Sequence, residues 1–142
     1  MVILLSIKPE YTKKIFSGKK KFEFRKQKLN FPPSLVFVYE SYPTKKIVGW
    51  FTVKKMIAGT PKDIWNKCIH EGGITERKFF EYCQGNEIIY AFEIDKTFRF
   101  PIPLDPFTID AYFKPPQNFS YRNYSIPHLG FKEQKVLYDA GN

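Results

Sequence analysis

The sequence has no apolar run that approaches the ~18–20 residues needed to cross a membrane, which argues against a transmembrane helix. The opening run Val2–Ile7 is apolar, but no basic residues precede it and Lys8 and Pro9 end it. Because a signal peptide needs a basic start and a longer apolar core, we expect a first strand here. No membrane partner is expected.

Cysteine and histidine are also scarce, with two of each. Cys68 and Cys83 belong to no Cys-x-x-Cys pair, and Cys68-x-His70 is too short for the usual zinc spacing. We therefore expect no metal or other cofactor. The two thiols are typical of reduced cysteines in a cytoplasmic protein.

Acidic residues are rare in the first 55 positions, which carry 3 of them against 13 basic residues, whereas residues 56–142 carry 11 acidic and 10 basic ones. Nine of the basic residues lie between positions 8 and 28. A positive surface of this kind attracts phosphate, so a nucleic-acid partner is expected. A content of 43% hydrophobic and 18% aromatic residues excludes intrinsic disorder, and the length of 142 predicts one domain spanning residues 1–142.

Hydrophobic periodicity and the positions of glycine and proline predict short strands with helices inserted among them. We expect strands at Val2–Ile7, Lys20–Arg25, Ser34–Tyr39, Ile47–Val53, Glu87–Ile94 and near Phe119–Tyr121, and helices at Pro9–Ser17, from Pro61 to about Cys68–His70, and from Thr75 to about Tyr82. In Glu87–Ile94 we expect Ile88, Tyr90 and Phe92 to share one face. The alternation and the Gly/Pro corners favour an α+β fold, a small, mostly antiparallel β-barrel with flanking short helices.

The first strand, helix and second strand bring six cations towards one end of the sheet: Lys8, Lys19, Lys20, Lys21, Arg25 and Lys26. They predict a strongly positive concavity with one carboxylate, Glu23. Glu23 and Arg25 share the strand face opposite Phe22 and Phe24, so they can pair with each other. The alternative is a solvated charged face with an ordinary ion pair.

The spacing Gly18-x-Lys20-x-x-Glu23-x-Arg25, behind a strand ending in Ser-Ile-Lys-Pro and a short helix, resembles the ASCH domain of the PUA-like superfamily. The resemblance covers roughly residues 2–95. It implies a compact PUA-like barrel with a cleft beside the motif, for which nucleic-acid binding, mostly of RNA, has been proposed. It also implies Lys20, Glu23 and Arg25 as cleft residues and Gly18 as the tight turn into the strand.

Some proteins of this family are enzymes, one branch hydrolysing the amide of N4-acetylcytidine and another cleaving RNA. The resemblance to the first branch implies Lys20 as catalytic, with a further glutamate from a later helix at Glu76 or Glu81. That branch has threonine where this chain has Glu23. A catalytic lysine must be partly neutral, which cationic neighbours favour and Glu23 opposes, so the sequence leaves open whether the protein is an enzyme.

A segment rich in proline and aromatic residues, 101–142, follows the strands. Aromatic rings stack on unpaired bases and arginine binds phosphate, so Tyr121 and Arg122 are candidate ligand contacts. The alternative is that these aromatics seal the end of the barrel.

The sequence thus predicts a domain that binds RNA, as a single strand or a modified nucleotide, in a basic cleft. It leaves the oligomeric state open, and a monomer is assumed. The candidate ligand-binding residues are Lys8, Gly18, Lys19, Lys20, Lys21, Glu23, Arg25, Tyr121 and Arg122. The alternatives are a small hydrolase acting on RNA or an acylated cytidine-type nucleoside, with Lys20 and Glu23 as catalytic residues, and a protein-interaction module.

Overall fold

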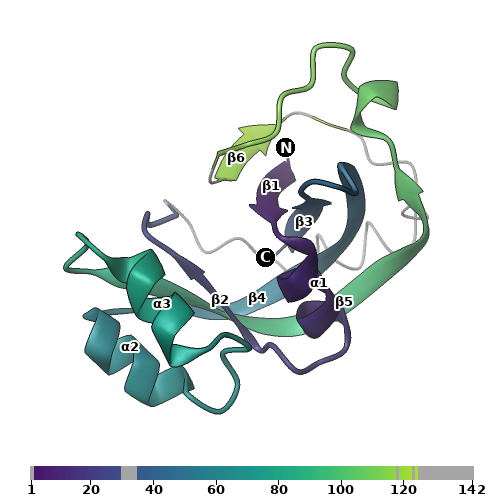
Figure 1. Cartoon of the computed structure of the whole chain (residues 1–142). Helices are drawn as coiled ribbons and strands as arrows, with labels where there is room; N and C mark the ends of the chain where they lie inside the picture. Colours follow the sequence, from purple (N-terminus) through teal and green to yellow (C-terminus); the bar gives the residue numbers. More distant parts are fainter. Residues whose placement is uncertain (1, 30–34, 118, 123, 125–142) are drawn as a thin grey trace.

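A computed structural model describes residues 2–29, 35–117, 119–122 and 124 (Figure 1). Its elements are β1 (Val2–Ile7), α1 (Pro9–Phe16), β2 (Phe22–Arg25), β3 (Leu35–Glu40), β4 (Lys46–Gly59), α2 (Pro61–Cys68), α3 (Glu76–Cys83), β5 (Ile89–Leu104), the 3₁₀ helix η1 (Pro106–Thr108) and β6 (Phe119–Arg122). The part of segment 101–142 beyond residue 124 lies outside the described residues. No described helix is long and apolar enough to span a membrane.

The six strands form one mixed sheet in the order β2-β5-β4-β3-β1-β6. Only β1 and β3 run parallel among the described strand pairs, and the other pairs are antiparallel. The prediction of a mostly antiparallel α+β barrel is confirmed. The sheet curls into a half-barrel. It remains open between β2 and β6, because these strands stand at the two ends of the strand order.

Two long strands produce the curl. The register between β4 and β5 shifts at three places along their length, and such bulges bend and twist a ladder (Figure 1). Both strands continue past the predicted ends at Val53 and Ile94. Pro101 and Pro103 are tolerated inside β5 because they fall where the ladder is interrupted, between the pairs Gly49–Arg99 and Ile47–Leu104.

The helix starts follow the sequence signals. Pro9 occupies the first turn of α1, and the Thr60 and Thr75 hydroxyls accept hydrogen bonds from the backbone N–H groups of Asp63 and Lys78. These caps fix where α2 and α3 begin, so the loop between the two helices reaches β2 at a defined place.

The first part of β5 carries buried residues on both of its faces. Ile89 and Ala91 are fully buried against α2 and α3, whereas Ile88 is 45% exposed. Phe92 is also fully buried, on the opposite face, where it stands across from Glu23 of β2. Alternation does not separate buried from exposed positions here, because this part of the sheet is covered on both sides.

Candidate functional site

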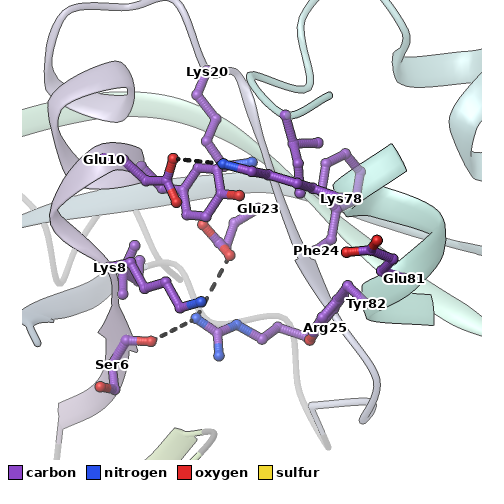
Figure 2. A pocket seen from close by; sticks show the side chains of 13 residues that line it. Ser6, Lys8, Glu10, Lys20, Glu23, Phe24, Arg25, Lys78, Glu81 and Tyr82 are labelled. Carbon is purple, nitrogen blue, oxygen red and sulfur yellow. Dashed lines mark hydrogen bonds and ion pairs between the residues drawn. The ribbon is translucent and has the colours of Figure 1, made fainter. Parts of the chain in front are cut away.

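A cavity of about 530 Å³ opens between the end of β1, the start of α1, strand β2 and helix α3 (Figure 2). It is lined by Ser6, Ile7, Lys8, Glu10, Tyr11, Lys20, Glu23, Phe24, Arg25, Ile74, Lys78, Glu81 and Tyr82. This volume lies within the range of small-molecule sites, roughly 300–1,000 Å³. Among the described residues, no group of histidine, cysteine and acidic side chains could hold a metal ion.

Lys20 is buried in the wall of this cavity, with 3% of its surface exposed. Its Nζ donates a hydrogen bond of 2.6 Å to the carbonyl oxygen of Gly72 and lies over the rings of Phe24 and Tyr11, at 4.7 and 5.3 Å from their centroids. The loop that joins α2 to α3 therefore fixes the position of the ammonium group.

Burial lowers the pKa of Lys20 from its ordinary value, and the charges of Arg25 and Lys14 act in the same direction. The charge of Glu23 raises the pKa but does not outweigh the burial. Of the opposing influences that the sequence left open, burial of Lys20 is the largest, and it shifts the pKa towards the neutral amine.

Glu23 and Arg25 form an ion pair inside the cavity, with 3.6 Å between Glu23 Oε1 and Arg25 Nη2. Each residue is 8% exposed, so the alternative of a solvated charged face is wrong. The same Nη2 donates to the backbone oxygen of Ser6 at 3.0 Å (Figure 2). The second carboxylate oxygen, Glu23 Oε2, is buried and accepts no hydrogen bond from a described residue, so the carboxylate keeps one unused acceptor in the cavity wall.

The rim of the cavity carries a second charged pair. Lys78 Nζ of α3 lies 3.2 Å from Glu10 Oε2 of α1, and both side chains are about half exposed. Glu81 also lines the cavity, whereas Glu76 does not. Of the two glutamates left open for the later helix, Glu81 is therefore the one beside the motif.

The lining is of mixed charge, with four cations (Lys8, Lys20, Arg25, Lys78) and three carboxylates (Glu10, Glu23, Glu81). The strongly positive concavity expected from the sequence is therefore not what forms. Lys19 and Lys21 are exposed outside the cavity, and Lys21 pairs with Glu71 at 3.9 Å. Lys26 also lies outside the lining, with its Nζ over the ring of Tyr82. These three cations therefore do not contribute to the lining of the cavity.

Gly18 does not line the cavity but has the predicted turn role. It follows α1 with φ of +83°, a conformation that glycine adopts without strain, and the chain then enters β2 through Lys20.

Tyr121 and Arg122 lie on β6, at the other edge of the sheet from β2, and do not line the cavity. Arg122 donates to the oxygens of Ser120, Tyr124 and Lys114 at 2.7, 3.0 and 2.6 Å. These bonds tie β6 to the proline-rich segment, which agrees with the alternative that this segment closes the barrel end. Ligand contact at these two residues stays a prediction.

Two of the three α3 residues that line the cavity, Lys78 and Tyr82, were not predicted from the sequence. Lys78 and Tyr82 are one helical turn apart, so they share a face of α3. That spacing was readable in the sequence. Which face of α3 meets β2 depends on the packing of Phe79 and Cys83 against Phe24, and no local pattern reveals it.

We expect the stability of the protein to rise with pH because of Lys20. The unfolded chain holds the Lys20 proton up to about its ordinary pKa of 10.5, whereas the folded chain releases it at lower pH. Between these two values the unfolded state binds more protons, so the free energy of unfolding increases with pH. Comparison with Lys20→Met, which keeps an apolar stem, isolates the effect in urea titrations. Parallel pH profiles for the two proteins would exclude it.

Comparison with known proteins matches residues 5–98 to the ASCH domain. An "ASCH domain-containing ribonuclease" of Zymomonas mobilis subsp. mobilis is 31% identical over 121 residues, covering 83% of this chain and 82% of that protein. The crystal structure of ASCH from Zymomonas mobilis superimposes with a TM-score of 0.78 at 25% identity, over 99% of this chain and 95% of that one. The crystal structure of a variant of the Zymomonas mobilis ASCH protein with a serine-to-alanine substitution superimposes with a TM-score of 0.77.

Proposed function

This chain belongs to the ASCH domain family, and on that premise we propose that it binds single-stranded RNA by taking one unpaired nucleotide into the cavity beside β2. The observation that carries the proposal is the buried carboxylate oxygen Glu23 Oε2, which has no hydrogen-bond donor in the described protein. A buried acceptor left unpaired is unfavourable, so a ligand that donates an N–H to it is stabilised. The ribonuclease name of the Zymomonas relative supports RNA as the polymer.

The base would be recognised by the Glu23–Arg25 pair. Glu23 Oε2 would accept a hydrogen bond from an exocyclic amino group, as a carboxylate does from cytosine N4, while the Arg25 guanidinium offers N–H donors to neighbouring base acceptors. The rings of Tyr11 and Tyr82 also line the cavity and provide aromatic surface for a splayed-out base. A cavity of this size suits one nucleotide better than a duplex.

The phosphates of the flanking nucleotides would lie outside the cavity, at exposed lysines that do not line it. Lys13, Lys19 and Lys21 are such residues. Such residues contribute sequence-independent attraction that weakens with salt, whereas the cavity contributes selection of the base.

RNA cleavage is a second candidate, which the burial of Lys20 and its lowered pKa favour. A neutral Lys20 amine would take the proton of a ribose 2′-hydroxyl. The 2′-oxygen would attack the adjacent phosphorus as the bond from phosphorus to the 5′-oxygen breaks. The 5′-oxygen would take a proton from solvent water, giving a 2′,3′-cyclic phosphate and a 5′-hydroxyl, and Lys20 would return its proton to solvent. The same Lys20 could serve the hydrolysis of an acylated cytidine, a reaction of one branch of this family.

The binding test measures the affinity for a fluorescent single-stranded RNA of about 5–10 nucleotides, which is one to two site sizes. It compares the wild-type protein with the double variant Glu23→Gln/Arg25→Met. Because the variant removes both polar partners of the base, we expect affinity to fall at least about ten-fold. Lys46→Met/Asp105→Asn, which removes one charge of each sign from a partly exposed ion pair outside the lining, is the matched control. Equal affinity of the two double variants at every salt concentration, or a salt slope near zero, would refute the proposal.

The same incubations report on cleavage. RNA and N4-acetylcytidine are analysed by chromatography, with Lys20→Met as the variant that lacks the amine. Products that form equally with Lys20→Met would exclude the catalytic role of Lys20 while leaving the binding result intact.

A further inference from the structure

The contact between Glu10 and Lys78 joins two elements that stand on different sides of the cavity. Glu10 lies in the first turn of α1 and Lys78 in α3, 68 residues apart in the sequence, and Figure 2 shows them reaching towards each other from the two helices. Both residues line the cavity. Glu23, the carboxylate proposed to bind the base, lines the same cavity as this rim pair.

The rim of the cavity carries one lysine that forms no ion pair with a described residue and one lysine that is held by a carboxylate. Lys8 lines the cavity, is exposed, and forms no ion pair with any described residue. Lys78 is held by Glu10, whose hydrogen bond raises the pKa of Lys78 and so keeps it charged. A phosphate would therefore bind Lys8 directly, whereas it would bind Lys78 only after the pair between Lys78 and Glu10 has separated.

We infer that Lys8 and Lys78 form a phosphate subsite for the nucleotide whose base contacts Glu23, and that Glu10 occupies Lys78 until the phosphate displaces it. This inference rests on the proposed function and adds a residue, Glu10, that weakens anion binding. The exchange replaces one anion with another at Lys78, and the half-exposed Glu10 carboxylate is then solvated by water. Since Glu10 is a competing anion, its removal strengthens binding where loss of an ordinary contact residue would weaken it.

The test is a double-mutant cycle on the binding of the same short single-stranded RNA at fixed ionic strength. Exposed ion pairs contribute about 0.2–1 kcal/mol, so we expect Glu10→Gln to tighten binding by roughly 1.4- to five-fold. Lys78→Met should weaken binding, and Glu10→Gln added to Lys78→Met should have little further effect. Glu76→Gln, which removes the same charge from α3 outside the lining, is the control for a general electrostatic change.

The outcomes separate the subsite from the proposed function. If Glu10→Gln leaves the affinity unchanged or weakens it, or has the same effect with and without Lys78, then Glu10 does not compete for Lys78 and the subsite is wrong. This conclusion holds even if binding still depends on Glu23 and Arg25. If the wild-type protein binds no RNA, the proposed function fails and the subsite falls with it. A decrease in Tm of Glu10→Gln without tighter binding would identify the pair as a structural tie only.

Discussion

Replacing Arg25 with alanine should lower the free energy of unfolding by about 3–5 kcal/mol, the usual range for breaking a buried ion pair. The reason is that Glu23, 8% exposed, would keep its charge in the cavity wall without the guanidinium 3.6 Å away. The carbonyl of Ser6 would also lose the hydrogen bond that Arg25 donates to it. Urea unfolding followed by tryptophan fluorescence measures the change.

A double variant separates stability from recognition. Glu23→Gln/Arg25→Met removes both charges and keeps side chains of similar size, so it should recover a large part of the stability lost in Arg25→Ala. It should not recover RNA binding, because both groups that contact the base are gone. If the double variant is as unstable as Arg25→Ala, the cost comes from lost packing instead of an uncompensated charge, and this account of the pair is wrong.

Substitution of Gly73 with alanine should cost about 3 kcal/mol of stability and displace Lys20. Gly73 has φ of +65°, a conformation that costs an L-residue roughly 1–2 kcal/mol. A Cβ atom there would also lie 2.6 Å from the Cβ of Lys20, and overpacking of this kind adds about 1–3 kcal/mol. Because the adjacent Gly72 carbonyl accepts the hydrogen bond from Lys20 Nζ, movement of the loop releases the ammonium group.

Gly85 provides the matched control. Its φ is +82°, and a Cβ atom at this position would meet nothing within 4 Å. Gly85→Ala should therefore lose only the conformational part, about 1–2 kcal/mol. Lysines methylated with ¹³C report the second effect by NMR, where the pKa of Lys20 should move towards its ordinary value in Gly73→Ala and remain lowered in Gly85→Ala. Equal stability losses and equal Lys20 titrations in both variants would show that the loop does not position Lys20.

Part of the site follows from local patterns. The period of two in β2 predicts that Glu23 and Arg25 share a face, and the structure confirms their pairing. Pro9 and the cap residue Thr75 predict where α1 and α3 begin, and those starts are also confirmed. These features depend on neighbours within a few residues, which the sequence displays directly.

The electrostatic character of the site does not follow from the sequence. The number of lysines near β2 predicts a basic cleft, yet Lys19 and Lys21 are exposed outside it while Glu81, more than fifty residues later, lines it. The lowered pKa of Lys20 comes mainly from burial, and that burial requires the Gly72–Gly73 loop to lie against it. Contacts between elements so distant in the chain are set by packing, and composition does not record them.

The most direct test of the proposed base-binding cavity is a crystal structure of the protein with a short single-stranded RNA. We expect one base inside the cavity, with an N–H group within hydrogen-bond distance of Glu23 Oε2 and its ring beside Tyr11 or Tyr82. RNA bound instead along β6, in contact with Tyr121 and Arg122 and with no base at Glu23, would contradict the proposal.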